Sequence, residues 1–251
     1  MSHFKSELGK VHYKEIGKGD ELLLMFHGNT HTSEIFKSHT KYFQDKYRII
    51  LPDLPGHGLS ERLKKLPKDY YQKCAEIFLN FLKEKKEKKV NIIGVDGGSI
   101  IAMIMASMND SVIKSVVANT FPGKKISNGK LDLIIEETKR KKKSFFERYR
   151  WKRLHGKDWY KIVDQYLEFL ENLKYSDERV VVPKIKKIKS RVLLTGSSND
   201  SMAPRLRPIY RKLHKRYPHF NVLLYYSGKY PERLTKKKKF REEILEFLKT
   251  G

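Results

Sequence analysis

The sequence has one cysteine, no long apolar run and no apolar leader at its N-terminus. Cys74 alone excludes an internal disulfide, which favours a reducing compartment. The apolar run from Ser99 to Ala106 is far shorter than the roughly 20 residues that a membrane helix needs. Residues 1–10 alternate polar and apolar side chains, unlike a signal peptide. We therefore expect a cytoplasmic protein without a membrane span.

Acidic residues are scarce beside basic ones, with 29 Asp and Glu against 54 Lys and Arg and a net charge of +25. Such a surface can bind nucleic acid, acidic membranes or anionic ligands. Lysine dominates most basic runs and no nucleic-acid-binding motif occurs, so we expect dispersed, solvated lysines and no dedicated nucleic-acid binding. One run differs: from Lys139 to Arg153, aromatic residues interleave with Lys and Arg.

The 251 residues are enough for one large domain with a buried core. Short apolar segments alternate with longer amphipathic ones, which is typical of an α/β domain. This alternation predicts a mostly parallel, doubly wound sheet. The expected strands are Val11–Ile16, Leu22–Phe26, Tyr47–Leu51, Val90–Val95, Val112–Ala118, Arg191–Thr195 and Asn221–Tyr226. The first of them alternates like an edge strand, and the second is apolar throughout, as in a strand buried on both faces.

The pattern changes between residues 122 and 189, where helical stretches rich in charge replace the strands. A helical insertion between two sheet strands predicts a lid, since ligands bind beyond the carboxyl ends of such strands. We therefore expect a core of residues 1–121 and 190–251, and a lid of residues 122–189. Five aromatic residues are expected to pack the lid onto the core or to line an apolar pocket: Phe145, Phe146, Tyr149, Trp151 and Trp159.

The segment from Asn91 to Ser99 joins a buried strand directly to an apolar helix, with Asp96 between small residues. This context is typical of a nucleophile elbow, in which a tight turn exposes the central side chain above the sheet. The amides at the start of the following helix stabilise negative charge there.

Four separated segments resemble the α/β-hydrolase superfamily, in the family's order and over nearly the whole chain. They are His27-Gly28 after a buried strand, the D-x-x-G-x-G-x-S segment Asp53–Ser60, the elbow Gly94–Gly98, and the loop Gly196–Pro204 with Asp200. The resemblance implies the α/β-hydrolase fold with a helical lid. It also implies that Asp96 occupies the nucleophile position and Asp200 the acid position.

The elbow reads G-x-D-x-G instead of the family's usual G-x-S-x-G. This is similar to haloalkane dehalogenases and epoxide hydrolases, whose carboxylate attacks carbon to form an ester that a histidine-activated water hydrolyses. The alternative is that Asp96 is a replacement that only caps the helix.

The family's catalytic histidine follows the last strand, and by that spacing the position holds Tyr230. No histidine occurs after His219. Tyrosine, with an unperturbed pKa of about 10, is a poor base near neutral pH. Asp200 then lacks the imidazole it would orient. The two carboxylates, Asp96 and Asp200, are too few ligands for a metal ion, so neither a metal nor a cofactor is expected.

The oxyanion hole of the family uses backbone amides, which correspond here to those near Asn29 and of Gly97. Backbone donors persist when side chains change, so a polarised binding pocket is expected even without turnover. His31 lies in the loop that should border this pocket. It is expected to be a pocket-wall residue and is the alternative candidate for a relocated base.

The leading interpretation is an α/β-hydrolase-fold protein with a degenerate triad at Asp96, Asp200 and Tyr230. It would bind a small acyl- or alkyl-type ligand and hydrolyse it slowly or not at all. One alternative is an active Asp96-nucleophile hydrolase, and another is a serine ester hydrolase whose catalytic residues are altered in this form. A third, of a different class, is a basic binding module that uses the Lys139–Arg153 run. The sequence does not indicate an oligomeric state.

Overall fold

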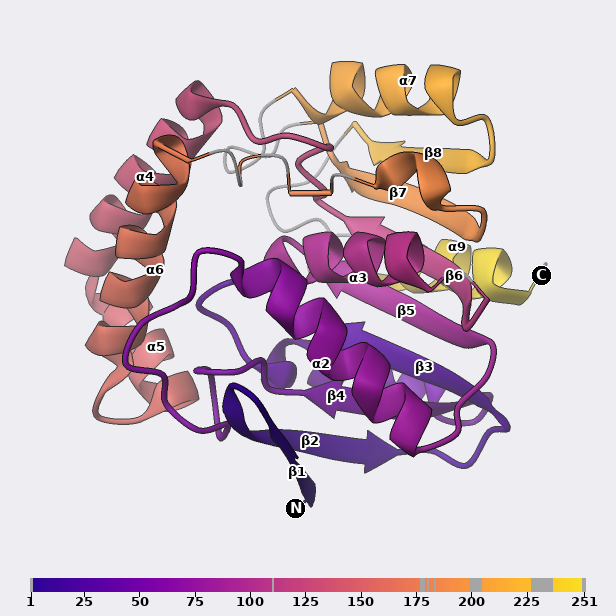
Figure 1. Cartoon of the computed structure of the whole chain (residues 1–251), viewed down its shortest axis with the longest axis horizontal. Coiled ribbons are helices and arrows are strands. Elements are labelled where there is room, and N and C mark those ends of the chain that lie inside the picture. Colours follow the sequence, from indigo (N-terminus) through magenta and orange to yellow (C-terminus); the bar gives the residue numbers. More distant parts are fainter. Residues whose placement is uncertain are drawn as a thin grey trace.

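One sheet organises the computed structural model, which describes residues 2–109, 111–176, 179, 181–182, 184–198, 205–226 and 237–249. In this part of the chain the sheet has eight strands in the order β1-β2-β4-β3-β5-β6-β7-β8 (Figure 1). Their bounds are β1 Ser2–Ser6, β2 Gly9–Ile16, β3 Glu21–Phe26, β4 Tyr47–Pro52, β5 Val90–Val95, β6 Ile113–Asn119, β7 Arg191–Ser197 and β8 Phe220–Tyr225.

The strands from β4 to β8 run parallel, whereas β1 and β2 pair in antiparallel fashion. The predicted mostly parallel α/β sheet is thus confirmed. The expectation that Val11–Ile16 forms an edge strand is wrong, because β1 covers that edge in a hairpin with β2. The short segment Ser2–Ser6 carries one apolar residue, Phe4, whose ring lies 4.4 Å from that of Phe81. A single apolar position gives no periodicity from which a strand can be predicted.

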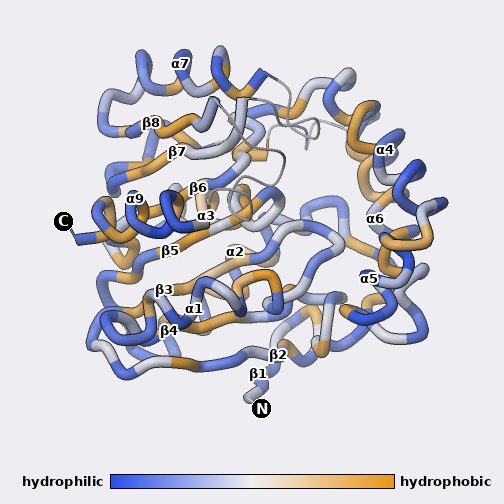
Figure 2. Tube along the Cα trace, turned by 180° about the vertical axis from the view of Figure 1, so that it is seen from behind, coloured by the Kyte–Doolittle hydropathy of each residue, from blue (hydrophilic) through white to orange (hydrophobic). Residues whose placement is uncertain are grey.

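Helices cover both faces of the sheet. On one face lie α2 (Tyr70–Glu84), α3 (Gly97–Met108) and α7 (Leu206–Arg216), as Figure 1 shows. On the other lie α1 (Lys37–Phe43), after the 3-10 turn η1 (Ser33–Phe36), and α9 (Lys237–Lys249), which are in front in Figure 2. The 3-10 turn η3 (Ile185–Lys187) precedes β7.

Two apolar cores follow from the strand period of two. In β3, Leu22, Leu24 and Phe26 point into the core that contains α2 and α3. Leu23 and Met25 point into the core that contains α9. All five side chains are at most 1% exposed, which explains why the sequence of β3 is apolar at every position after Glu21.

In the described residues between β6 and β7, the chain inserts three α-helices: α4 (Asn128–Lys143), α5 (Phe145–His155) and α6 (Trp159–Lys174). They lie beyond the carboxyl ends of the central strands (Figure 1). Arg62 ties them to the loop after β4, since its guanidinium donates to the carbonyl of His155 at 2.7 Å and to Asp158 Oδ2 at 3.0 Å. Gln165 Nε2 donates to the Leu63 carbonyl at 2.7 Å.

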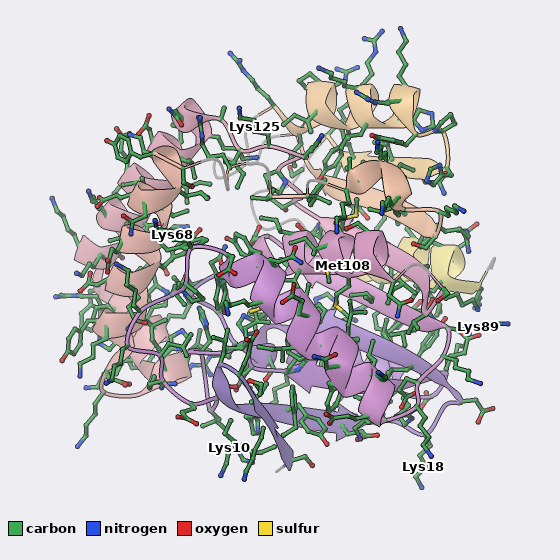
Figure 3. All side chains as sticks on the ribbon, viewed as in Figure 1. Lys10, Lys18, Lys68, Lys89, Met108 and Lys125 are labelled. Carbon is green, nitrogen blue, oxygen red and sulfur yellow. The ribbon has the colours of Figure 1, made fainter. Side chains whose placement is uncertain are left out.

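Basic side chains surround the molecule. Figure 3 labels exposed lysines at several edges of the fold, among them Lys10, Lys18, Lys89 and Lys125. This dispersal agrees with the expectation of solvated lysines. Among the described residues, no helix is both long enough and apolar enough to cross a bilayer.

Candidate active site

Asp96 lies at the sharp turn between β5 and α3. Its backbone has φ 49° and ψ −117°, a conformation that costs a residue with a side chain about 1–3 kcal/mol. The turn is held on both sides. The Asp96 amide donates to the carbonyl of Asn119 at 3.0 Å, and Ser99 donates to the Asp96 carbonyl from its amide at 2.9 Å and its hydroxyl at 2.5 Å. Ser99 is fully buried, so it stabilises the turn and is not exposed to the space above it.

The small residues around the turn are required by close backbone packing. A Cβ atom at Gly94 would lie 2.3 Å from the carbonyl oxygen of Gly98, and one at Gly98 would lie 2.5 Å from that of Phe26. A Cβ at Gly28 would lie 2.6 Å from Asp96 Oδ2. Helix α3 can therefore approach β3 closely, and Asp96 packs against the loop that follows β3.

A cavity of about 90 Å³ opens onto Asp96. Four residues singled out from the sequence line it together: Asn29, His31, Asp96 and Gly97. The remaining lining residues come from the loop after β3, the start of α2, α3, the segment after β6 and the inserted helices: Thr30, Tyr71, Ile100, Thr120, Pro122, Ile126, Lys130, Ile134, Thr138, Lys141, Arg150, Trp151, Tyr166 and Leu170. Asp200 and Tyr230 lie outside the described residues.

Two buried phenols hold Asn29 in place. Tyr71 donates its hydroxyl to Asn29 Oδ1 at 3.3 Å, and Tyr166 also bonds to the Asn29 side chain. Burial raises the pKa of both phenols, and the nearby Asp96 carboxylate raises it further. Both tyrosines therefore remain protonated. Sequence analysis missed them, because a tyrosine on an amphipathic helix does not differ in pattern from a core residue.

The inserted helices bring positive charge to the cavity through Lys130, Lys141 and Arg150. Lys141 also lies 3.8 Å from Glu137, and Arg150 lies 2.6 Å from Glu147, on their own helices. Asp96 is the acidic residue among the described lining residues. No group of three or more His, Cys, Asp or Glu side chains suited to a metal ion occurs among the described residues.

His31 has both ring nitrogens in contact with neighbours. Its Nδ1 lies 2.9 Å from the carbonyl of Asn29, to which it donates. Its Nε2 then accepts from Nη1 of Arg150 at 3.4 Å. A nitrogen whose lone pair faces a guanidinium is a weak proton acceptor. This arrangement favours a pocket-wall role for His31.

Buried histidines support the loops beneath the cavity. His27 donates from Nδ1 to the Gly28 carbonyl at 2.7 Å and accepts at Nε2 from the Leu54 amide at 2.9 Å. Burial lowers the pKa of His27 to about 4, that of His57 to about 3 and that of His155 to about 4. His27 therefore supports the loop that follows β3.

The D-x-x-G-x-G-x-S segment has a structural role as well. Asp53 accepts hydrogen bonds from the amides of Ser33 at 2.8 Å and Leu59 at 2.9 Å. Burial alone would raise the pKa of Asp53, but His27 and these amides hold it below its usual value. Gly58 has φ +54°, and a Cβ there would lie 2.3 Å from Asp53 Oδ2.

The aromatic residues of the insertion divide into two groups. Trp151 is 1% exposed, lines the cavity and stacks on Trp159 with ring centroids 5.7 Å apart. Phe145, Phe146 and Tyr149 are 69%, 82% and 64% exposed. The expectation that all five pack inward is therefore wrong for these three, because they occupy the outer face of the short helix α5.

Residues 21–177 match the family described as alpha/beta hydrolase fold. The chain belongs to this family. A serine hydrolase of Homo sapiens, BPHL, is 24% identical over 249 residues, which cover 95% of this chain and 83% of that protein. Haloalkane dehalogenase 2 of Mycobacterium tuberculosis is 31% identical over 117 residues, which cover 45% of this chain and 39% of the dehalogenase.

Solved structures of the family share the fold over the whole length. An alpha/beta hydrolase enzyme from a Medee basin deep-sea metagenome library aligns with a TM-score of 0.79, covering 100% of this chain and 98% of the other at 18% identity. An esterase from Exiguobacterium antarcticum aligns with a TM-score of 0.71 at 16% identity, covering 99% of both chains.

Proposed function

We propose that this α/β-hydrolase-fold protein binds a small acyl- or alkyl-type ligand in the cavity at Asp96 and hydrolyses it slowly or not at all. The observation that carries the proposal is the side chain at the apex of the turn. It is a carboxylate above a small, mainly apolar cavity, and the sequence offers Tyr230 where the family has its histidine. Without an imidazole at that position, the step in which water attacks an acyl or alkyl intermediate lacks the base that the family uses.

The proposed division of the chain follows from the same cavity. Residues 122–189 act as a lid, and residues 1–121 and 190–251 form the core. Support comes from Lys130, Arg150 and Trp151, which line the cavity from the insertion, opposite Asp96. The buried free thiol of Cys74 is consistent with a cytoplasmic location.

The other groups of the site, the backbone amides and His31, are proposed to bind the ligand without supporting its hydrolysis. The amides of Gly97 and of the Asn29 loop would polarise a bound carbonyl, which is supported by the position of both residues in the cavity lining. The contact of His31 with Arg150 supports a pocket-wall role instead of that of a base. The cations of the lid favour a ligand with an acidic group. Butyrate should therefore bind at least about tenfold more tightly than the neutral, matched butyramide.

Binding and turnover are measurable separately. Trp151 and Trp159, the two tryptophans of the chain, stack at the cavity, so ligand entry should change tryptophan fluorescence in a saturable way. Nitrophenyl butyrate should be hydrolysed no faster by the unaltered protein than by Asp96→Asn. The matched control Asp132→Asn removes an exposed carboxylate on α4. A kcat of about 1 s⁻¹ or more that Asp96→Asn abolishes would show an active hydrolase and refute the proposal.

A second candidate is an Asp96-nucleophile hydrolase, favoured by the carboxylate at the apex and by the 31% identity to a haloalkane dehalogenase. Incubation with 1-bromobutane or 1,2-epoxybutane, followed by intact-mass measurement, separates three outcomes. A persistent adduct on Asp96 indicates covalent capture without release. Steady bromide release that Asp96→Asn abolishes indicates a dehalogenase. The absence of both argues against nucleophilic chemistry with these substrates.

The serine-hydrolase alternative has a direct test. If the catalytic residues of this form are altered, Asp96→Ser combined with Tyr230→His should restore nitrophenyl ester turnover. The single variant Asp96→Ser, which still lacks a base, is the matched control.

A further inference from the structure

The outer face of α5 exposes three aromatic side chains within five residues. Phe145, Phe146 and Tyr149 are 69%, 82% and 64% exposed, and the two phenylalanine rings touch edge to face with centroids 6.0 Å apart. Isolated exposed apolar residues are ordinary, but a contiguous group of large ones marks an interaction surface. None of the three lines the cavity at Asp96.

Cations surround this aromatic group. Lys143, Arg148, Lys152 and Arg153 are all exposed, and within the described part of the chain none of them forms a salt bridge. From residue 139 to 153 the sequence has nine Lys and Arg residues against one acidic residue, Glu147, whose carboxylate pairs with Arg150.

The position of α5 leaves this surface accessible. The helix packs beside α4 and α6 in the insertion (Figure 1), and its three outer aromatic side chains are exposed. Its opposite face is anchored by Trp151, which is 1% exposed, and by His155, which accepts at Nδ1 from the Gly58 amide at 3.2 Å. The helix is thus fixed to the protein on one face and presents aromatic and cationic side chains on the other.

We propose that this surface, the α5 outer patch (Lys143, Phe145, Phe146, Arg148, Tyr149, Lys152 and Arg153), binds an anionic lipid bilayer. Aromatic side chains favour the boundary between headgroups and acyl chains, and the lysines and arginines beside them attract acidic lipids. The protein would lie on the bilayer without crossing it. The proposal is independent of whether Asp96 takes part in catalysis.

Two features favour a bilayer over RNA as the partner. Phe145 and Phe146 carry no polar group and are 69% and 82% exposed, which suits burial at the boundary between headgroups and acyl chains. The sequence also lacks a nucleic-acid-binding motif.

Co-sedimentation of the full chain with vesicles tests the proposal. We expect binding to vesicles of 70% phosphatidylcholine and 30% phosphatidylserine, at least about tenfold weaker binding to pure phosphatidylcholine, and a steep fall between 0.1 and 0.5 M NaCl. Equal binding to both vesicle types, or no binding to either, would overturn the proposal.

Paired variants separate the patch from the net charge of the protein. Phe145→Ser with Phe146→Ser should weaken binding at least about tenfold, while the matched pair Tyr175→Ser with Tyr226→Ser, at exposed tyrosines elsewhere, should not. Lys152→Glu with Arg153→Glu should weaken it at least about tenfold, and the equivalent change Lys212→Glu with Lys215→Glu on α7 should have a much smaller effect.

Two outcomes of these measurements would contradict binding of the α5 outer patch to a bilayer. If the α7 pair weakens binding as much as the α5 pair, the attraction comes from overall charge and the proposal is wrong. If the α5 variants lose binding to a single-stranded RNA of about 20 nucleotides while vesicle binding is absent or unchanged, the patch is a nucleic-acid surface and the proposal is again wrong. Because the substituted side chains are exposed, circular dichroism and thermal unfolding should remain unchanged.

Discussion

The turn at Asp96 and the helix α5 border the same cavity, but they are held in different ways. The turn is held by backbone packing at distances that only glycine permits, and by hydrogen bonds to adjacent strands. The insertion that carries α5 is held by side chains. Its apolar residues, among them Leu131, Trp151 and Phe169, join the core that contains α2 and α3. Arg62, His155 and Gln165 add hydrogen bonds. The comparison teaches that the turn depends on close backbone contacts, whereas the insertion depends on side chains that single substitutions can remove.

A fall in pH should have the largest effect on the free energy of unfolding, because it protonates histidines that are buried where the insertion meets the rest of the protein. Burial holds the pKa values of His27 and His155 at about 4 and that of His57 at about 3, against 6.5 in an unfolded chain. Between pH 6.5 and 4 the unfolded chain therefore binds more protons than the folded one. Stability should be full above pH 6.5 and fall as the pH drops towards 4.

Urea unfolding followed from pH 7.5 to 4.5 measures this dependence. The variant His57→Phe should reduce the steepness of the fall, since one of the buried proton-binding groups is gone. A midpoint that stays constant between pH 7 and 5 would contradict the assignment of these histidines as neutral, buried groups.

Gly98→Ala should have the next largest effect, since its Cβ would meet the carbonyl oxygens of Phe26 and His27 at 2.5 and 2.6 Å. We expect a loss of about 3 kcal/mol in the free energy of unfolding. Gly129→Ala in α4 is the matched control, because its Cβ meets nothing within 4 Å and the change should stabilise the protein by about 0.5 kcal/mol. Equal effects of the two changes would contradict the packing account of the turn.

Arg62→Ala should have a smaller and more local effect. It removes hydrogen bonds to Asp158 and to the carbonyls of Gly58 and His155, at a cost of about 1–2 kcal/mol for a partly exposed group. Hydrogen exchange should accelerate in α5 and α6 but not in α3. Arg140→Ala, which breaks an exposed pair with Glu137, should have a much smaller effect on the free energy of unfolding. If exchange rises equally in α3, the insertion is not separately anchored.

The same contrast explains what the sequence could predict. The bounds of β5 agree with the prediction, because a tight strand-to-helix turn has strict local requirements in the sequence. One cavity is indeed lined by the predicted residues Asn29, His31, Asp96 and Gly97. The division of α5 into inner and outer aromatic residues could not be predicted. An eleven-residue helix with aromatic and basic residues all round has no apolar face, so periodicity does not indicate its orientation.

Helix α5 is a rigid rod about 16 Å long, with Trp151 directed inward and Phe146 directed outward. One helix therefore carries both a wall of the cavity and the exposed aromatic side chains. If a partner that binds the outer face reorients this helix, the cavity wall moves with it, and linkage then requires that a molecule bound in the cavity change the affinity for that partner by the same free energy.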